Sequence, residues 1–308
     1  MFGAGTDPDA FPPVPGLNLF SRAFGVNDAG QAVGIAVPPS SCCIRAASFS
    51  AGSAPVDLGS LGGADYGSGA FGINNAGQIV GVSGTSSGNR ATLFGVGSAP
   101  VDLGVVNGLT TSVARSVNNS GQIVGQSAGL GVGPAVATLF NTANGAVNLG
   151  ILSGYGGSSA RAIGDSGIIV GVSTNNGALR ATLFSTSAAP VDLGGLGGVR
   201  SVADSVNSSG LIVGYSTLAG DLAGHAAIFG ASNGPMDLND LIDPSSGWEL
   251  LAATAVNDAG QIVGLGLIGG QYRAFLATPV PEPGTLALLA VSLLGLRIFQ
   301  ARATVASA

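Results

Sequence analysis

Carboxylates and amides that recur at one position of a short motif are the first groups that could do chemistry. The motif reads PVDLG in most copies, and its third position is occupied by Asp57, Asp102, Asn148, Asp192 and Asp237. A calcium loop would crowd several oxygens within about a dozen residues, whereas each copy here supplies one. An Asp or Asn near a strand end instead accepts hydrogen bonds from the N–H groups of the following turn. We therefore expect a repeated structural role for this position and no metal site.

Arginines recur at the start of a second motif, which reads RATLF in two copies. Arg45, Arg90, Arg180 and Arg273 occupy this place in four of the six copies. Their regular placement predicts side chains that face solvent or pair with the recurring acids of a neighbouring repeat. The alternative is a ring of arginines that holds an acidic polysaccharide, because the guanidinium fork matches the geometry of a carboxylate.

The chain offers few other groups for catalysis. It has one histidine, two glutamates and two cysteines, which are adjacent. Metal sites need spaced Cys and His ligands, so we expect His225 to be incidental. Cys42 and Cys43 could be free surface thiols or could form a disulfide with another chain, and the sequence leaves both alternatives open. The sequence contains neither a phosphate-binding loop nor a metalloprotease or hydrolase signature. We therefore expect no catalytic residues, no cofactor and a protein that is not an enzyme.

A hydrolase with its site in a central channel is a third interpretation. Such a site would require titratable groups to converge at one end of the channel. Arg115, Arg161 and Asp204 occur only sporadically in the strands that would line it. The sequence therefore disfavours this interpretation.

All these residues are placed by an internal repeat. A motif of the form NDAGQIVG recurs every 43 to 50 residues, at 27–34, 74–81, 118–125, 164–171, 207–214 and 257–264. The arginine motif follows each copy, at 45–49, 90–94, 136–140, 180–184, 225–229 and 273–277. The acidic motif follows the first five copies only, at 55–59, 100–104, 146–150, 190–194 and 235–239. Self-similarity at such a period indicates a repeat architecture.

Each repeat is expected to form about four short strands. Side chains alternate before the first motif, as in 112–118, and the Asn pairs that open the motif belong to a hairpin turn that ends in glycine. Four short antiparallel strands in this length are typical of one β-propeller blade. Six of them could form a closed ring or an open β-solenoid.

The acidic motif favours the closed ring. It is missing after the sixth copy, while Leu17, Asn18 and Leu19 match its pattern before the first. An N-terminal strand would then complete the last blade and remove an open sheet edge, whereas a solenoid would need polar caps. We predict an all-β fold, a six-bladed β-propeller over 17–277.

The composition changes after Ala277. The tail holds Pro281, Glu282 and Pro283, then an apolar run over 285–296, then Arg297 and Arg302. A helix over 285–299 would span about 22 Å, short of a hydrocarbon core of about 30 Å unless Arg297 snorkels. We expect a short transmembrane helix within 278–308, with the arginines on the cytoplasmic side. The alternative is a buried helix that belongs to the domain.

The tail resembles the PEP-CTERM sorting signal of Gram-negative bacteria, through the Pro281-Glu282-Pro283 triplet, the apolar run and the arginines Arg297 and Arg302. The resemblance implies recognition by an exosortase, a membrane-embedded cysteine transpeptidase that cuts near the triplet. It also implies an exported protein at the cell surface, in the outer envelope or in the extracellular matrix, anchored transiently in the inner membrane. An exopolysaccharide is a second implied partner.

The repeats resemble the HAF repeat of extracellular bacterial proteins. This repeat is named for a His-Ala-Phe triplet. The motif at 225–229 begins with His-Ala, while the other copies have Arg or Val in the place of the histidine. This resemblance implies an extracellular location and no established activity.

Charge and composition narrow the function further. Charged residues make up 8% of 308 residues, the net charge is −6 and the only cations are ten arginines. Neutralising phosphates needs clustered cations, so we expect no nucleic-acid partner. We predict a non-enzymatic surface or matrix protein. The alternative is a carbohydrate-binding, lectin-like propeller, although one Trp (Trp248) and four Tyr offer few stacking platforms.

The beginning of the chain lacks a secretory signal. Residues 1–16 have neither a basic region nor an apolar run. We expect an unstructured leader over 1–16 and a true start upstream of Met1.

Overall fold

The computed structural model describes residues 20–37, 43–129, 133–141, 145–220, 223–230 and 234–280. The chain divides into two units, Met1–Leu276 and Ala277–Ala308. Within the described residues, every strand begins in the first unit.

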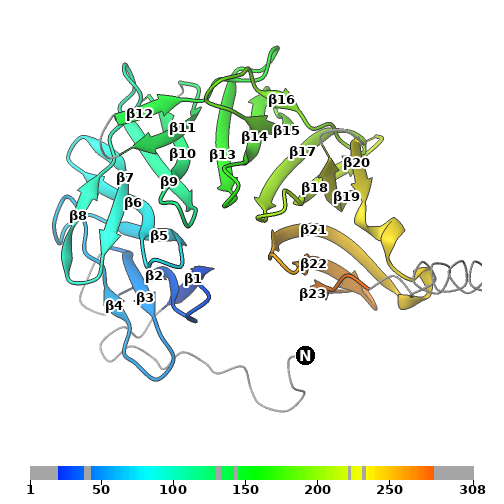
Figure 1. The fold of residues 1–308 in the computed structure, drawn as a ribbon, viewed down its shortest axis with the longest axis horizontal. Coiled ribbons are helices and arrows are strands. Elements are labelled where there is room, and N and C mark those ends of the chain that lie inside the picture. The colour runs from blue at the N-terminus through cyan, green and yellow to red at the C-terminus, as the bar shows by residue number, and fades with distance from the viewer. Residues whose placement is uncertain are drawn as a thin grey trace, which may run out of the picture. The chain divides into compact units, whose positions relative to one another are not determined.

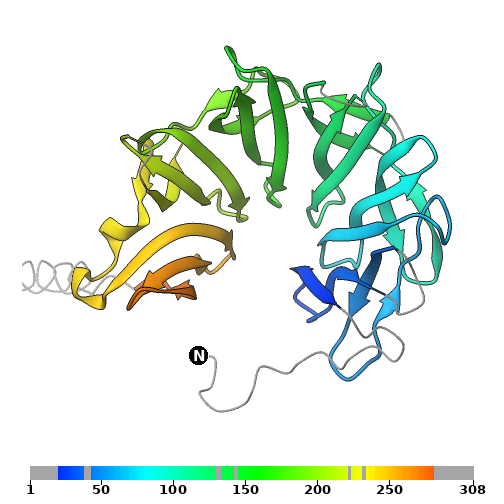
Figure 2. The same ribbon diagram turned by 180° about the vertical axis from the view of Figure 1, so that it is seen from behind.

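Each of the six repeats folds into an antiparallel group of strands, which we call a module (Figures 1 and 2). Modules 1 to 3 comprise β1 (Ser21–Val26), β2 (Ala32–Ala36), β3 (Arg45–Phe49) and β4 (Val56–Asp57); β5 (Ser68–Ile73), β6 (Ile79–Thr85), β7 (Gly88–Gly95) and β8 (Ser98–Asp102); and β9 (Thr111–Val117), β10 (Ile123–Ala128), β11 (Val136–Asn141) and β12 (Gly145–Asn148). Modules 4 to 6 comprise β13 (Gly157–Ile163), β14 (Ile169–Asn175), β15 (Ala178–Phe184) and β16 (Val191–Asp192); β17 (Gly197–Val206), β18 (Ile212–Leu218), β19 (Gly224–Gly230) and β20 (Gly234–Asp237); and β21 (Trp248–Val256), β22 (Ile262–Ile268) and β23 (Gln271–Ala277). Two short 3-10 helices, η1 (Leu238–Leu241) and η2 (Pro244–Ser246), connect modules 5 and 6.

The predicted all-β class and the four-stranded repeats are confirmed. Modules 4 and 5 are joined into one sheet by a single parallel bridge, between Leu179 and Arg200. The sheets of the described residues stay open, and module 6 has three strands there. Leu17, Asn18 and Leu19, which were expected to supply its fourth strand, lie outside the described residues, so ring closure stays a prediction.

The predicted tail helix over 285–299 also lies outside the described residues. Within the residues that are described, no helix is long and apolar enough to cross a membrane. The short transmembrane helix therefore stays a prediction.

The first motif makes a hairpin turn that its own asparagine holds. In module 1 the N–H of Gly30 donates to the carbonyl of Asn27 at 3.0 Å, and Gly30 has a φ of 74°. The N–H of Gln31 donates to the Asn27 side chain at 2.9 Å. The same two bonds form at Asn74, Asn118, Asn207 and Asn257. The turn therefore needs an amide at its first position and a glycine that tolerates positive φ.

A β-bulge follows the same rule in all six modules. At the same place in each first strand one residue is skipped by the pairing with the second strand, and we call these six the bulge residues: Phe24, Phe71, Arg115, Arg161, Asp204 and Thr254. The first strands of modules 5 and 6 have a further irregularity nearer their N-terminal ends. The extra residue brings the first-strand backbone close to the second strand. A Cβ on Gly81, the last residue of its motif, would overlap the carbonyl of Gly69. The glycines at the matching positions, Gly34, Gly125, Gly171, Gly214 and Gly264, meet the same obstacle. The final glycine of the motif is therefore required by the bulge.

The hydrophobic core lies between successive modules. Val80 of module 2 packs with Ala114 and Phe140 of module 3, and Val124 of module 3 packs with Ala160 of module 4. Matching clusters contain Val33 in module 1 and Val170 in module 4. The motif valines of modules 1 to 4 thus cover the next module, and burial of this apolar surface is the main force that joins these repeats.

Candidate functional site

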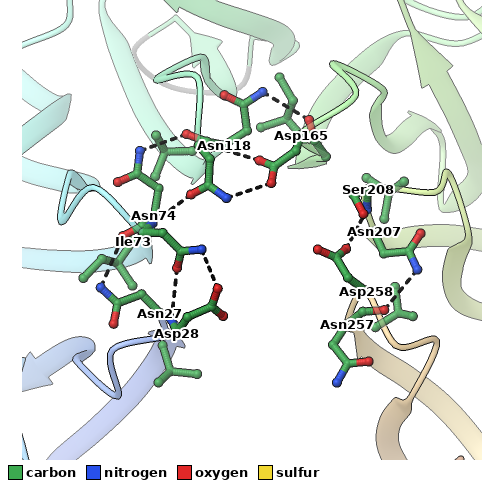
Figure 3. Close-up of a pocket in the computed structure, with 18 of the residues that line it drawn as sticks. Asn27, Asp28, Ile73, Asn74, Asn118, Asp165, Asn207, Ser208, Asn257 and Asp258 are labelled. Atoms are coloured by element: carbon green, nitrogen blue, oxygen red, sulfur yellow. Dashed lines mark hydrogen bonds between the residues drawn. The ribbon is translucent and has the colours of Figure 1, made fainter.

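The turns of all six repeats line one pocket, which we call the turn pocket (Figure 3). Its volume is about 490 Å³. The polar residues that line it are Asn27, Asp28, Asn74, Asn75, Asn118, Asn119, Asp165, Asn207, Ser208, Asn257 and Asp258. They come from the first two positions of each repeated turn, so the repeat brings equivalent residues together.

The first turn residue links each module to the next. The side-chain amide of Asn27 donates to the carbonyl of Asn74 at 3.3 Å, and that of Asn74 donates to the carbonyl of Asn118 at 2.9 Å. The series continues from Asn118 to Gly164 at 3.1 Å and, in later modules, from Asn207 to Asn257 at 3.0 Å. Asn74, Asn118 and Asn207 are buried. A buried amide with both its donor and its acceptor engaged stabilises the structure, whereas an unpartnered one would be costly.

The second turn residue makes a parallel series of bonds. The N–H of Asp28 donates to Asn75 at 3.0 Å, and the N–H of Asn75 donates to Asn119 at 2.8 Å. Asn119 donates in the same way to Asp165 at 2.8 Å. In later modules the N–H of Ser208 donates to Oδ1 of Asp258 at 2.8 Å. Hydrogen bonds from Ser208, the backbone N–H first, hold the pKa of Asp258 below its usual range.

These bonds limit the chemistry of the turn pocket. Its asparagines and aspartates are engaged in fixing the turns, and the lining residues include no histidine, cysteine or lysine. Across the described part of the chain, no three His, Cys, Asp or Glu side chains gather as a metal site. The polar and acidic residues that line the turn pocket therefore join neighbouring modules to one another.

The recurring acids of the third motif have the structural role expected of them. Oδ1 of Asp57 accepts from the N–H of Gly59 at 2.8 Å, and Asn148 accepts from Gly150 at the same distance. Asp102, Asp192 and Asp237 accept equivalent bonds from the residue two positions on. The prediction of a backbone hydrogen bond at this position is confirmed.

The arginines of the second motif pair with these acids inside one module. Nε of Arg45 lies 3.2 Å from Asp57, and Nε of Arg180 lies 3.4 Å from Asp192. Arg90 lies at 3.9 Å from its own partner, Asp102. Pairing with the acids is thus confirmed, but the expected pairing between repeats is wrong, because the third and fourth strands of one module are neighbours. Arg273 instead donates to Gln271 at 2.5 Å.

His225 was expected to be incidental, and this prediction is wrong. Its Nδ1 lies 2.5 Å from Oδ2 of Asp237, and its Nε2 lies 3.7 Å from Glu249. The histidine occupies the place of the recurring arginine and meets the same acid. Alignment of His225 with Arg45, Arg90 and Arg180 would have found the Asp237 contact, whereas Glu249 lies outside the repeated motifs.

Arg115, Arg161 and Asp204 lie near one another, which their scattered places in the sequence did not indicate. Nη1 of Arg161 lies 2.6 Å from Oδ1 of Asp204. Burial lowers the pKa of Arg115, and the charge of Arg161 lowers it further. Burial also raises the pKa of Asp204, against the opposing effect of Arg161. All three are bulge residues of adjacent modules.

The remaining predicted residues divide between the described and undescribed parts of the chain. The thiol of Cys43 donates to the carbonyl of Asp65 at 3.4 Å. Cys42 lies outside the described residues, as do the sorting residues Pro281, Glu282, Pro283, Arg297 and Arg302.

Comparison with known proteins identifies the tail. A family model of the PEP-CTERM protein-sorting motif matches residues 279–302. No curated protein matches the chain. The match includes the Pro281-Glu282-Pro283 triplet, the apolar run, Arg297 and Arg302, which were predicted to form the signal. The chain therefore carries a PEP-CTERM sorting motif, which supports an exported protein of a Gram-negative bacterium that an exosortase sorts.

Proposed function

We propose that this protein is a non-enzymatic component of the cell surface or extracellular matrix. An exosortase would process it near Pro281, Glu282 and Pro283 after export. The observation that carries the proposal is the sorting motif over 279–302. The repeats, which resemble HAF repeats, would then be the part displayed outside the cell.

The tail would act before processing as a transient membrane anchor. Its apolar run over 285–296 precedes Arg297 and Arg302. Arginines on one side of an apolar segment favour a cytoplasmic end for that side. The modules would therefore stay outside the inner membrane until the exosortase cuts.

A binding or structural role fits the described site better than catalysis. The polar groups of the turn pocket are already bound to one another, as with Asn74 and Asn118. Catalysis would instead require a nucleophile and a base within reach of each other and of a substrate.

We also propose that the six modules close into a β-propeller. Two exposed ends support closure. Val263 of module 6 is 39% exposed, although the matching Val33, Val80 and Val213 are fully buried against the next module. Val26 of module 1 is 67% exposed, whereas the matching Val117 is buried. Contact between modules 6 and 1 would bury both.

Hydrogen-bonding groups at these two ends are also complementary. At other junctions the N–H of the second turn residue donates to the next module's side chain, as Ser208 does to Asp258. The N–H of Asp258 and the carboxylate of Asp28 would make the same bond. Leu17, Asn18 and Leu19 would add the fourth strand beside β23.

Fractionation of cells tests the sorting proposal. The full chain, fused to a cleavable export signal, would be produced in Gram-negative strains with and without an exosortase gene. We expect a shortened protein at the surface or in the medium only when the exosortase is present. Replacement of Pro281, Glu282 and Pro283 by alanine should leave the full-length protein in the membrane fraction. The unchanged chain in the strain without an exosortase gene is the reference for an unprocessed protein. Identical fractionation of the alanine variant and the unchanged chain would overturn the proposal.

Carbohydrate binding is the second candidate function. The observation that favours it is the row of aromatic and arginine side chains on the first strands of modules 1 to 4.

A further inference from the structure

The bulge residues vary in type between copies of the same scaffold. Modules 1 and 2 present Phe24 and Phe71, modules 3 and 4 present Arg115 and Arg161, and module 5 presents Asp204. The rest of the bulge is constant, including the alanine before it and the motif glycine opposite. Function commonly resides in variable side chains that a constant scaffold positions.

The bulge residues lie on neighbouring strands in chain order. The rings of Phe24 and Phe71 pack edge to face, with centroids 5.5 Å apart. A Cβ on Gly72, the residue after Phe71, would lie 3.1 Å from the carbonyl oxygen of Arg115. Arg161 and Asp204 meet across the next junction at 2.6 Å. Aromatic rings therefore lie on one side of Arg115 along this row, and a guanidinium–carboxylate pair lies on the other.

This row carries more positive charge than its own carboxylate neutralises. Arg22 stacks over the Phe24 ring, with its guanidinium carbon 4.8 Å from the centroid. Arg115 donates to the neutral amide of Gln126 at 3.4 Å. Within the described residues no carboxylate lies within ion-pair distance of Arg22 or Arg115, whereas Arg161 has Asp204.

The arginines of the third strands differ from Arg115 in this respect. Arg45, Arg90 and Arg180 each face an aspartate of their own module. The positive charge of each of these arginines is therefore already balanced by a carboxylate. The acidic-polysaccharide site considered for those arginines is therefore disfavoured, and the first-strand arginines offer a different place for it.

We propose that the first strands of modules 1 to 4 form a binding site for a carboxylate-bearing sugar, such as a uronate unit of an acidic polysaccharide. The planar fork of Arg115 would take the carboxylate with two hydrogen bonds. The faces of Phe24 and Phe71 would pack against the apolar C–H face of the pyranose ring. Asp204 would hold Arg161 in place beside the ligand. A few oriented polar groups beside an apolar surface are typical of small-ligand sites.

The proposed binding acts at short range. The net charge of −6 opposes the long-range approach of any polyanion, an acidic polysaccharide included. Local guanidinium groups beside aromatic rings can still hold single carboxylates at short range. The inference deepens the carbohydrate-binding candidate and is independent of the sorting of the tail.

Isothermal titration calorimetry on the full chain tests the site. The probes are trigalacturonate, neutral maltotriose and inorganic sulfate. We expect binding of trigalacturonate only, and affinity that falls as salt concentration rises. Arg115→Gln should weaken binding by about tenfold or more, and Arg115→Lys should weaken it too because the fork is lost. Phe71→Leu should weaken binding while it preserves the apolar packing.

Arg90→Gln is the matched control, because it removes an arginine that already has a carboxylate partner. It should leave the affinity unchanged. Three outcomes would overturn the proposal: no binding of trigalacturonate, equal losses in Arg115→Gln and Arg90→Gln, or equal binding of sulfate or maltotriose. Thermal unfolding of each variant separates loss of the site from loss of the fold. Failure of the fractionation experiment would leave these results unaffected.

Discussion

The backbone N–H of Ser208 donates to Oδ1 of Asp258 at 2.8 Å, so a side chain of module 6 fixes the turn of module 5. Similar bonds join Asp28 to Asn75, Asn75 to Asn119 and Asn119 to Asp165. The repeated turn therefore serves as the connection between modules as well as the hairpin of each one.

Asp258→Ala should destabilise the junction between modules 5 and 6. The N–H of Ser208 would lose its partner, which costs about 1 kcal/mol in the free energy of unfolding. Asp258→Asn keeps an acceptor at the same place, as Asn75 and Asn119 do, and is the matched control. Chemical denaturation of both variants measures the effect. Equal stability of the alanine and asparagine variants would show that the bond does not join the modules.

Acid should weaken the same junction through Asp258. Its pKa is lower in the folded chain than its ordinary value of 3.8, since Ser208 donates hydrogen bonds to the carboxylate. The stability that it contributes is therefore complete above that ordinary value and is lost as pH falls through the lower, folded pKa. Asp258→Asn should show less acid destabilisation than the unchanged chain. The measurement is the unfolding midpoint between pH 5 and about pH 2, and identical pH profiles would contradict the expectation.

Gly81→Ala should be among the most destabilising small substitutions in the chain. The added Cβ would overlap the carbonyl of Gly69 across the bulge. Overpacking of this kind costs about 1–3 kcal/mol. Gly129→Ala is the control, because a Cβ there meets nothing within 4 Å and its φ is not positive. Melting temperatures would decide, and equal values for the two variants would disprove the role assigned to the bulge.

Asp192→Ala should cost more stability than Arg180→Gln. The aspartate accepts from the N–H of Gly194 at 2.7 Å and also pairs with Arg180 at 3.4 Å. Loss of Arg180 removes only a partly exposed ion pair, which is worth about 0–1 kcal/mol. Asp192→Asn should lose much less stability than Asp192→Ala, because an asparagine can accept the same backbone hydrogen bond, as Asn148 does in module 3. A larger effect from Arg180→Gln than from Asp192→Ala would reverse this ranking.

Arg161→Gln should raise the pKa of Asp204 further. Burial already raises this pKa, and Arg161 lowers it through its charge and its hydrogen bond. Removal of the arginine leaves burial less opposed. Titration of the Asp204 carboxyl carbon by NMR measures the change. An unchanged or lower pKa would mean that the two side chains do not interact in solution.

Several features followed from the sequence because they recur. The sequence predicted the turn glycines such as Gly30, the hydrogen bond of Asp57 and the number of strands in each repeat. All three depend on short local motifs that recur several times in the chain. The sorting motif of the tail could also be predicted from the sequence, because the triplet at Pro281, the apolar run and the arginines follow one another in a fixed order.

Other features depend on contacts that sequence spacing does not reveal. The bulge places Arg161 beside Asp204 although 43 residues separate them. The link between Asn74 and Asn118 likewise joins two repeats, and only the packing of modules creates it. The contact of His225 with Glu249 is of the same kind, because Glu249 lies outside the repeated motifs.

Contact between modules 6 and 1 is the central feature of the proposed closed ring. Cysteines would replace Asp28 and Asp258 in a chain whose Cys42 and Cys43 are serine, and a short bis-maleimide linker would be added. Asn75 and Asn119 as cysteines give the positive control, because these residues are bonded at 2.8 Å. Asn75 and Ser208 as cysteines, from modules that are not neighbours, give the negative control. A closed ring predicts intramolecular cross-linking of residues 28 and 258 as fast as in the positive control. Cross-linking no faster than in the negative control, or only between separate chains, would contradict it.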